Sequence, residues 1–100
     1  MKLRIQGDTI RIRVNDNEVS QLQSGQSLVS ATHFPGNVLE IKLTPENEDY
    51  VSYDNGQILI GVKMDKIMAW AESDEITIPM EFAVSDDKKL SILVEKDMKV

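Results

Sequence analysis

The chain alternates apolar and polar residues over most of its length, a period of two that is typical of β-strands with one buried face. The clearest run is residues 2–14, where apolar and basic residues alternate on either side of Gly7-Asp8. Similar runs flank Pro35-Gly36-Asn37, Asn55-Gly56 and residues 85–89. Because these are turn signals between alternating runs, the pattern predicts four β-hairpins.

Two segments depart from this alternation and favour short helices. Asn15 followed three residues later by Glu18 matches a capping box, and Gly25 supplies a terminator, so we expect a helix over residues 16–24. "MDKIMAWAES", residues 64–73, has the apolar spacing of a second helix, with Asp65 as the expected cap.

The predicted elements follow the order ββαββ twice, which suggests an internal repeat. Adding 48 to the residue number relates Ile10 to Ile58 and Leu22 to Trp70. Later in the chain three extra loop residues raise the offset, which relates Leu39 to Leu90. Alternating strands match at half of all shifts, so the coincidence of turn and helix at one shift is the informative part.

We therefore predict a single β-rich α+β domain over residues 1–100. It would have about eight antiparallel strands in a curved sheet or small barrel, with two short helices. Its pseudo-repeat halves would span about 1–48 and 49–100. Pro79 cannot donate a ladder hydrogen bond, so its strand is expected at an edge or with a bulge.

Composition narrows the functional classes. The chain has 11 basic and 17 acidic residues, a net charge of −6, which argues against general affinity for nucleic acid or anionic membranes. It has no cysteine, so disulfides and zinc–thiolate sites are excluded. No run approaches the roughly 18 apolar residues of a membrane span, nor a signal peptide, and we expect a cytoplasmic protein.

The first hairpin places like charges opposite one another. With a two-residue turn, Lys2 lies across from Arg13 and Arg4 from Arg11, which destabilises the strand pair. Residues 1–14 carry four basic and one acidic side chain, net +3, whereas the rest carries seven and sixteen, net −9. Either outward acids of neighbouring strands neutralise the four basic residues of the hairpin, or these basic residues form a face that binds an anion or an acidic partner. The acids considered are Glu40, Glu75, Glu81 and Glu95.

The matching positions of the second half are not basic. Tyr50 is expected over Gly61, an aromatic–glycine pair, and with Leu59 and Leu93 it would give an outward apolar surface. Such a surface is either covered by the same chain or used for association, including homodimerisation.

Other polar clusters have structural explanations. The Asn15–Glu18 cluster lacks the glycine and final glutamate of an EF-hand, and capping explains it. Glu46, Glu48, Asp49 and Asp54 surround turns, where they could gather around a cation, but acidic turns in an acidic protein are expected to be solvated. His33 is the single histidine, and sequence nominates no partner that would make it a general base. No cofactor or metal is predicted.

The opening "KLRIQGDTIRIR" and the closing "LSILVEKD" resemble a family of small bacterial proteins of unknown function. The resemblance covers most of the chain. Its motifs are structural, so it implies the domain and transfers no catalytic or ligand residues.

We expect a non-enzymatic binding or assembly module, with a protein partner or a second copy of the chain, and neither nucleic acid nor membrane. Two alternatives remain open. A small-ligand β-barrel would have a cavity lined by Tyr53, Trp70 and Phe82, and an enzyme would gather polar groups around His33.

Overall fold

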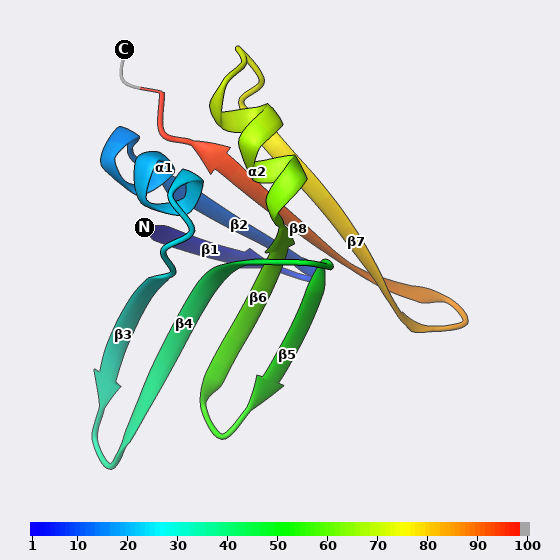
Figure 1. The fold of residues 1–100 in the computed structure, drawn as a ribbon. Coiled ribbons are helices and arrows are strands. Elements are labelled where there is room, and N and C mark those ends of the chain that lie inside the picture. The colour runs from blue at the N-terminus through cyan, green and yellow to red at the C-terminus, as the bar shows by residue number, and fades with distance from the viewer. Residues whose placement is uncertain (99–100) are drawn as a thin grey trace.

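The computed structural model describes residues 1–98 as eight strands and two helices (Figure 1). The first half contains β1 (Lys2–Gln6), β2 (Thr9–Val14), α1 (Asp16–Gln23), β3 (Leu28–Phe34) and β4 (Asn37–Glu46). The second half contains β5 (Tyr50–Asp54), β6 (Gln57–Lys63), α2 (Met64–Ala71), β7 (Thr77–Ser85) and β8 (Lys88–Lys96). The four predicted hairpins, the two helices and the β-rich class are confirmed.

The strands form two four-stranded sheets, each built from one hairpin of each half. Sheet A has the order β1-β2-β8-β7, and sheet B has the order β3-β4-β6-β5. The central pairs, β2 with β8 and β4 with β6, are parallel. The expectation of wholly antiparallel strands was therefore wrong at these pairs. A tight turn dictates an antiparallel hairpin, but it does not dictate how hairpins from different halves join.

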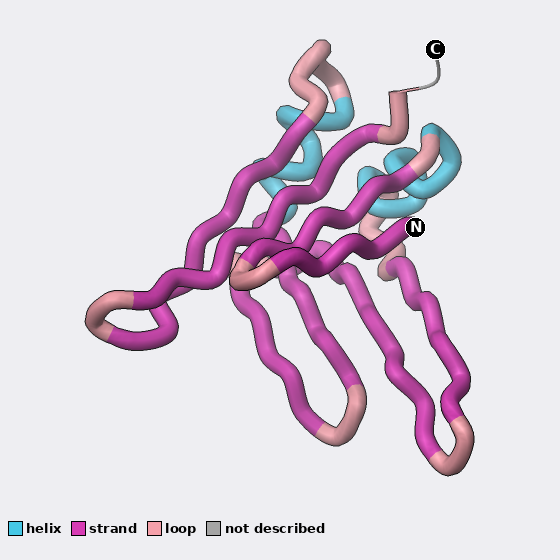
Figure 2. The backbone as a smooth tube through the Cα atoms, turned by 180° about the vertical axis from the view of Figure 1, so that it is seen from behind, coloured by secondary structure: helices cyan, strands magenta, loops and turns pink. Residues whose placement is uncertain are grey.

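The predicted small barrel is also wrong, because among residues 1–98 the two sheets remain separate. The hairpins β3–β4 and β5–β6 extend side by side away from sheet A, and the helices lie together at the opposite end of the molecule (Figures 1 and 2). A barrel needs continuous hydrogen bonding between its first and last strands. Here each sheet keeps two edges: β1 and β7 in sheet A, and β3 and β5 in sheet B.

The hydrophobic core joins the inner faces of both sheets to the two helices. Its fully buried members include Ile12, Leu43, Ile60 and Ile92 from the four central strands. Helix residues Leu22, Ile67 and Trp70 complete it. The period-two pattern thus predicted the buried face of each central strand. The alternation of residues 28–34 does not indicate which face of β3 is buried; in the structure Leu28 is buried and Val29 exposed.

Two local expectations are confirmed and one is corrected. Asn15 and Glu18 form the predicted capping box of α1, and Pro79 lies in the edge strand β7. Asp65 does not cap α2, whose N-cap residue Lys63 has no side-chain cap. Its backbone N–H instead donates to Asp49 Oδ1 at 2.8 Å. Neither helix is long and apolar enough to cross a membrane, as far as residues 1–98 are concerned.

Candidate functional site

The basic ladder, Lys2, Arg4, Arg11 and Arg13, lies on the outer face of sheet A. The two-residue turn gives the predicted register, with Lys2 opposite Arg13 and Arg4 opposite Arg11. All four side chains alternate with inward apolar residues and belong to exposed positions. The like charges therefore face solvent across adjacent strands.

The two rungs of this ladder differ in their counter-charges. Lys2 Nζ lies 3.6 Å from Asp97 Oδ2, and Arg13 Nε lies 4.0 Å from Glu95 Oε1. No carboxylate of residues 1–98 lies within 4.0 Å of the Arg4 or Arg11 guanidinium. Of the acids expected to neutralise the ladder, Glu95 does so.

The remaining proposed counter-charges have other surroundings. Glu40 Oε1 accepts a hydrogen bond from Gln57 Nε2 at 2.7 Å, in sheet B. Glu81 Oε2 lies 3.8 Å from Lys89 Nζ, and Glu75 belongs to the exposed loop before β7. The acids are thus spread over the molecule, and the Arg4–Arg11 rung is left to solvent.

The predicted apolar surface is divided between the two sheets. Tyr50 lies over Gly61 as expected, since a Cβ on Gly61 would sit 2.3 Å from the Tyr50 ring. Leu59 belongs to the same sheet, where it is half-buried. Leu93 belongs to sheet A, between Arg11 and Pro79. It therefore adjoins the basic ladder. Association through Tyr50 and Leu59 stays a prediction.

An apolar groove lies between the sheets, at the end away from the helices. It has a volume of about 470 Å³. Ile10 and Ile58 form its buried floor, while Ile5 and Tyr53 at its rim are 54% and 72% exposed. The other lining residues are Leu39, Val51, Ser52 and Leu90. Apart from Ser52, these positions follow the same alternation as the core, so no sequence signal separates them from buried residues.

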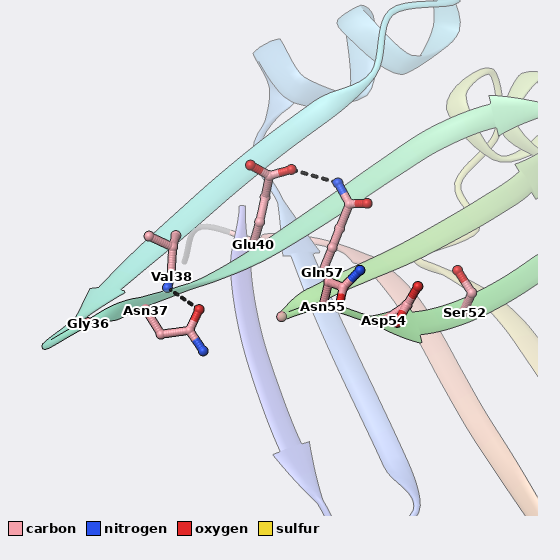
Figure 3. A pocket seen from close by; sticks show the side chains of 9 residues that line it. Gly36, Asn37, Val38, Glu40, Ser52, Asp54, Asn55 and Gln57 are labelled. Atoms are coloured by element: carbon pink, nitrogen blue, oxygen red, sulfur yellow. Dashed lines mark hydrogen bonds between the residues drawn. The ribbon is translucent and has the colours of Figure 1, made fainter.

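A polar hollow of about 720 Å³ lies on sheet B beside the tips of the hairpins β3–β4 and β5–β6 (Figure 3). Glu40, Gln57 and Asp54 come from three neighbouring strands, and Glu40 bonds to Gln57 across the sheet. Gly56 is required here, because a Cβ would meet the Val38 carbonyl oxygen at 2.7 Å. The glycine lets the Gly56 carbonyl accept the Glu40 N–H at 2.8 Å.

Of the residues expected to line a barrel cavity, Trp70 and Tyr53 lie apart, and Phe82 packs partly buried against the core. Trp70 is 1% exposed, and its Nε1–H donates to the Ile76 carbonyl at 2.8 Å. Tyr53 lies at the rim of the apolar groove. The prediction of a ligand cavity lined by these residues is therefore wrong, because Trp70 is buried in the hydrophobic core beside the helices. His33 is exposed on the edge strand β3, opposite Val38.

Within residues 1–98, two side chains beside the start of α2, Asp49 and Tyr50, have shifted pKa values. Burial alone would raise the pKa of Asp49. Its hydrogen bonds from Lys66 and the Lys63 backbone, with the positive charges of both residues, outweigh this and lower that pKa below 3.8. Burial, the nearby charge of Glu46 and a hydrogen bond to it raise the pKa of Tyr50. Asp49 therefore acts as a structural anchor of the helix. No cluster of three metal-ligating side chains occurs among residues 1–98.

Fold and surfaces together define a β-rich, two-sheet α+β domain with an open apolar groove and a basic outer face. The whole chain, residues 1–100, matches the model of a family described as a family of unknown function, DUF7009. The chain belongs to this family, as the resemblance in its opening and closing motifs indicated. No curated protein and no solved structure matches it.

Proposed function

We propose that this protein is a non-enzymatic binding module of the cytoplasm that receives an extended segment of a partner protein at β5. The observation that carries the proposal is the open edge of β5 beside the apolar groove. An added strand gains affinity from main-chain hydrogen bonds and specificity from its alternate side chains. At β5 the free main-chain groups of the edge and the apolar groove for side chains lie next to each other.

The backbone of β5 offers the required hydrogen bonds. The turn has positive φ at Asn55 and Gly56, as in a type I′ hairpin, so Asp54 and Gln57 form the hydrogen-bonded pair next to it. Alternation then turns the N–H and C=O groups of Val51 and Tyr53 away from β6. Their side chains line the groove, so the same two residues present both backbone and apolar contacts.

The other edges differ from β5 in ways that discourage strand addition. Charged residues, proline and bulges protect sheet edges from further pairing. Edge strand β1 carries Lys2 and Arg4, and β7 carries Pro79 and an irregular register between Ala83 and Ser85. On edge strand β3, Leu28 is followed on the same face by the polar residues Ser30 and Thr32, and the strand does not line the groove.

The groove suits the alternate side chains of such a segment. Its volume of about 470 Å³ lies within the roughly 300–1,000 Å³ of ligand sites. Its floor, formed by Ile10 and Ile58, is apolar and buried. Apolar residues at every second position of the partner would enter it, and their neighbours would face solvent.

Selection of extended peptides from a random library, followed by amide hydrogen exchange, tests this proposal. Selected peptides should alternate apolar and polar residues and should slow exchange at Val51 and Tyr53. Val51→Pro removes one outward N–H and should weaken binding at least tenfold. Ala31→Pro, a matched change on the edge of β3, should leave binding within twofold.

Equal effects of the two proline variants, or peptides without alternation, would refute the β5 site. Sedimentation velocity addresses the other occupant, a second copy. A wild-type dimer abolished by Val51→Pro would assign the edge to self-association in place of a partner. A dimer abolished by Leu59→Lys would assign association to the surface of Tyr50 and Leu59.

We further propose that the two halves are a structural repeat. Bounds of β1 and β5, and of α1 and α2, differ by 48 residues. The groove is lined by residue pairs at the corresponding offsets: Ile5 and Tyr53, Ile10 and Ile58, Leu39 and Leu90. Comparing the halves across family members tests this. Duplication predicts that one offset gives the best match in most members, whereas scattered offsets would contradict it.

A further inference from the structure

We propose that the Arg4–Arg11 rung on the outer face of sheet A binds a carboxylate-bearing segment of a partner protein. Arg4 and Arg11 lie directly opposite one another in the β1–β2 register. Like charges in this position destabilise a strand pair, and bound carboxylates would remove that repulsion. Arginine also matches a carboxylate with two parallel N–H donors, so the pair can hold two acidic side chains.

The neighbouring rung shows the same chemistry already satisfied within the chain. Lys2 and Arg13 have Asp97 and Glu95 at 3.6 and 4.0 Å. Arg4 and Arg11 have no such neighbour among residues 1–98. The difference follows from the strand next in the sheet, where Glu95 stands opposite Arg13 and Leu93 opposite Arg11.

Two hollows flank the unsatisfied rung. One, of about 160 Å³, is lined by Arg4, Gln6, Thr9 and Arg11. The other, of about 130 Å³, lies on the side of Lys2 and Arg13 and shares both arginines. Each hollow places guanidinium groups around a space where an acidic side chain can enter.

The rung continues into an apolar step. Leu93 follows Arg11 across the sheet, and exposed Pro79 follows Leu93. A segment crossing this face would meet two cations and then an apolar surface. This sequence of contacts fits an acidic peptide and can also receive an apolar side chain at Leu93.

The charge of the rest of the chain favours a short protein segment over nucleic acid or a membrane. Residues beyond 14 carry net −9, so a long polyanion approaching sheet A is repelled by most of the molecule. Screening limits this repulsion to about 8–10 Å at physiological salt. A short acidic segment on the rung therefore avoids most of it.

This site is separate from the β5 groove. Arg4 and Arg11 face outward from sheet A, whereas Ile5 and Ile10 beside them line the groove on the inner face. Loss of one site therefore leaves the other intact, and the two proposals can fail independently.

Fluorescence anisotropy with fluorescein-labelled hexaglutamate at 50 mM and 200 mM salt tests the proposal. Arg4→Gln/Arg11→Gln should weaken binding tenfold or more. The control Lys88→Gln/Lys89→Gln removes the same charge from the β7–β8 hairpin and should stay within twofold. Circular dichroism and urea unfolding check that each variant folds, and single variants at Arg4 and Arg11 serve if the double variant does not.

Absence of hexaglutamate binding by the wild type, or equal losses in the two double variants, would overturn the proposal. Oligodeoxythymidine and phosphatidylserine vesicles form the other arms of the experiment. Tighter binding of either, lost in Arg4→Gln/Arg11→Gln, would overturn the assignment to a protein partner. Weaker binding of both supports it.

Discussion

The two helices begin with the same contact but obtain it from different parts of the chain. In α1, Glu18 accepts the N–H of the N-cap residue Asn15 at 2.9 Å and pairs with the Met1 ammonium. In α2, Asp49 accepts the N–H of Lys63 at 2.8 Å and pairs with Lys66. Each helix start thus has one carboxylate, one N-cap N–H and one cation.

The charges are exchanged between the two sites. Adding 48 carries Met1 onto Asp49 and Glu18 onto Lys66. In the first half the helix supplies the anion, and in the second half the preceding segment supplies it. A carboxylate at a helix N-terminus is stabilising wherever it originates, because it meets unsatisfied N–H groups and the positive end of the helix dipole.

The largest expected difference between the halves lies at the last residue but one of each helix, where Trp70 corresponds to Leu22. Trp70→Leu would give both helices the same residue. It would leave a cavity and remove the Trp70 hydrogen bond to the Ile76 carbonyl, which keeps only the one from the Lys96 N–H; we expect it to lower the free energy of unfolding by about 3 kcal/mol. Urea unfolding followed by circular dichroism measures it, with Leu22→Met as the control. A loss below about 1 kcal/mol would contradict the tight packing of Trp70.

Removing the anchor of α2 should have the next largest effect. Asp49→Ala leaves the Lys63 N–H and Lys66 without their partner, and we expect a loss of about 1–2 kcal/mol. Asp65→Ala, at the residue that the sequence nominated as cap, should cost about 0.5 kcal/mol or less. Urea unfolding of both variants measures the two losses. A larger loss for Asp65→Ala than for Asp49→Ala would mean that Asp65 caps α2.

The lowered pKa of Asp49 predicts a defined pH dependence. Because the folded pKa lies below its usual value of 3.8, Asp49 contributes stability that is fully present above the unfolded pKa. This contribution is lost as the pH falls through the folded pKa. The stability difference between wild type and Asp49→Asn should be constant from pH 7 to about 5 and shrink below about pH 4. A difference that grew with acid would reverse the assignment.

Exchanging the charges should sharpen the comparison further. Lys66→Glu places a second carboxylate beside Asp49, and we expect a loss of about 1 kcal/mol. Adding Asp49→Lys recreates the arrangement of α1, with the carboxylate in the helix. The double variant should recover to within about 0.5 kcal/mol of wild type. Thermodynamic cycles from urea unfolding measure the coupling, and additive losses would argue against equivalent sites.

The smallest effect is expected on the basic ladder. Arg4→Gln relieves like-charge repulsion with Arg11 and should stabilise the chain by a few tenths of a kcal/mol at low salt. The gain should fade at 1 M salt, where the Debye length is about 3 Å. Parallel unfolding curves at both salts measure it. Destabilisation at low salt would mean that the guanidinium of Arg4 has a favourable partner.

The candidate surfaces differ in how far the sequence predicts them. The register of the basic ladder follows from the Gly7-Asp8 turn, because a two-residue connection fixes which residues face each other. The division of the Tyr50, Leu59 and Leu93 surface could not be predicted, since it depends on which sheet receives β8. The apolar groove could not be predicted from the sequence, because Ile5 and Tyr53 follow the same alternation as the core residues.

Local chemistry determined the strands, the turns, the α1 capping box and the buried face of each central strand, since each depends on residues a few positions apart. The tertiary structure decided the parallel joins, the open groove and the cap of α2. These depend on contacts between distant segments, as Asp49 and Lys63 illustrate across 14 positions. Hydrophobic periodicity indicates which face of a segment is buried, but it does not indicate which other segment covers that face.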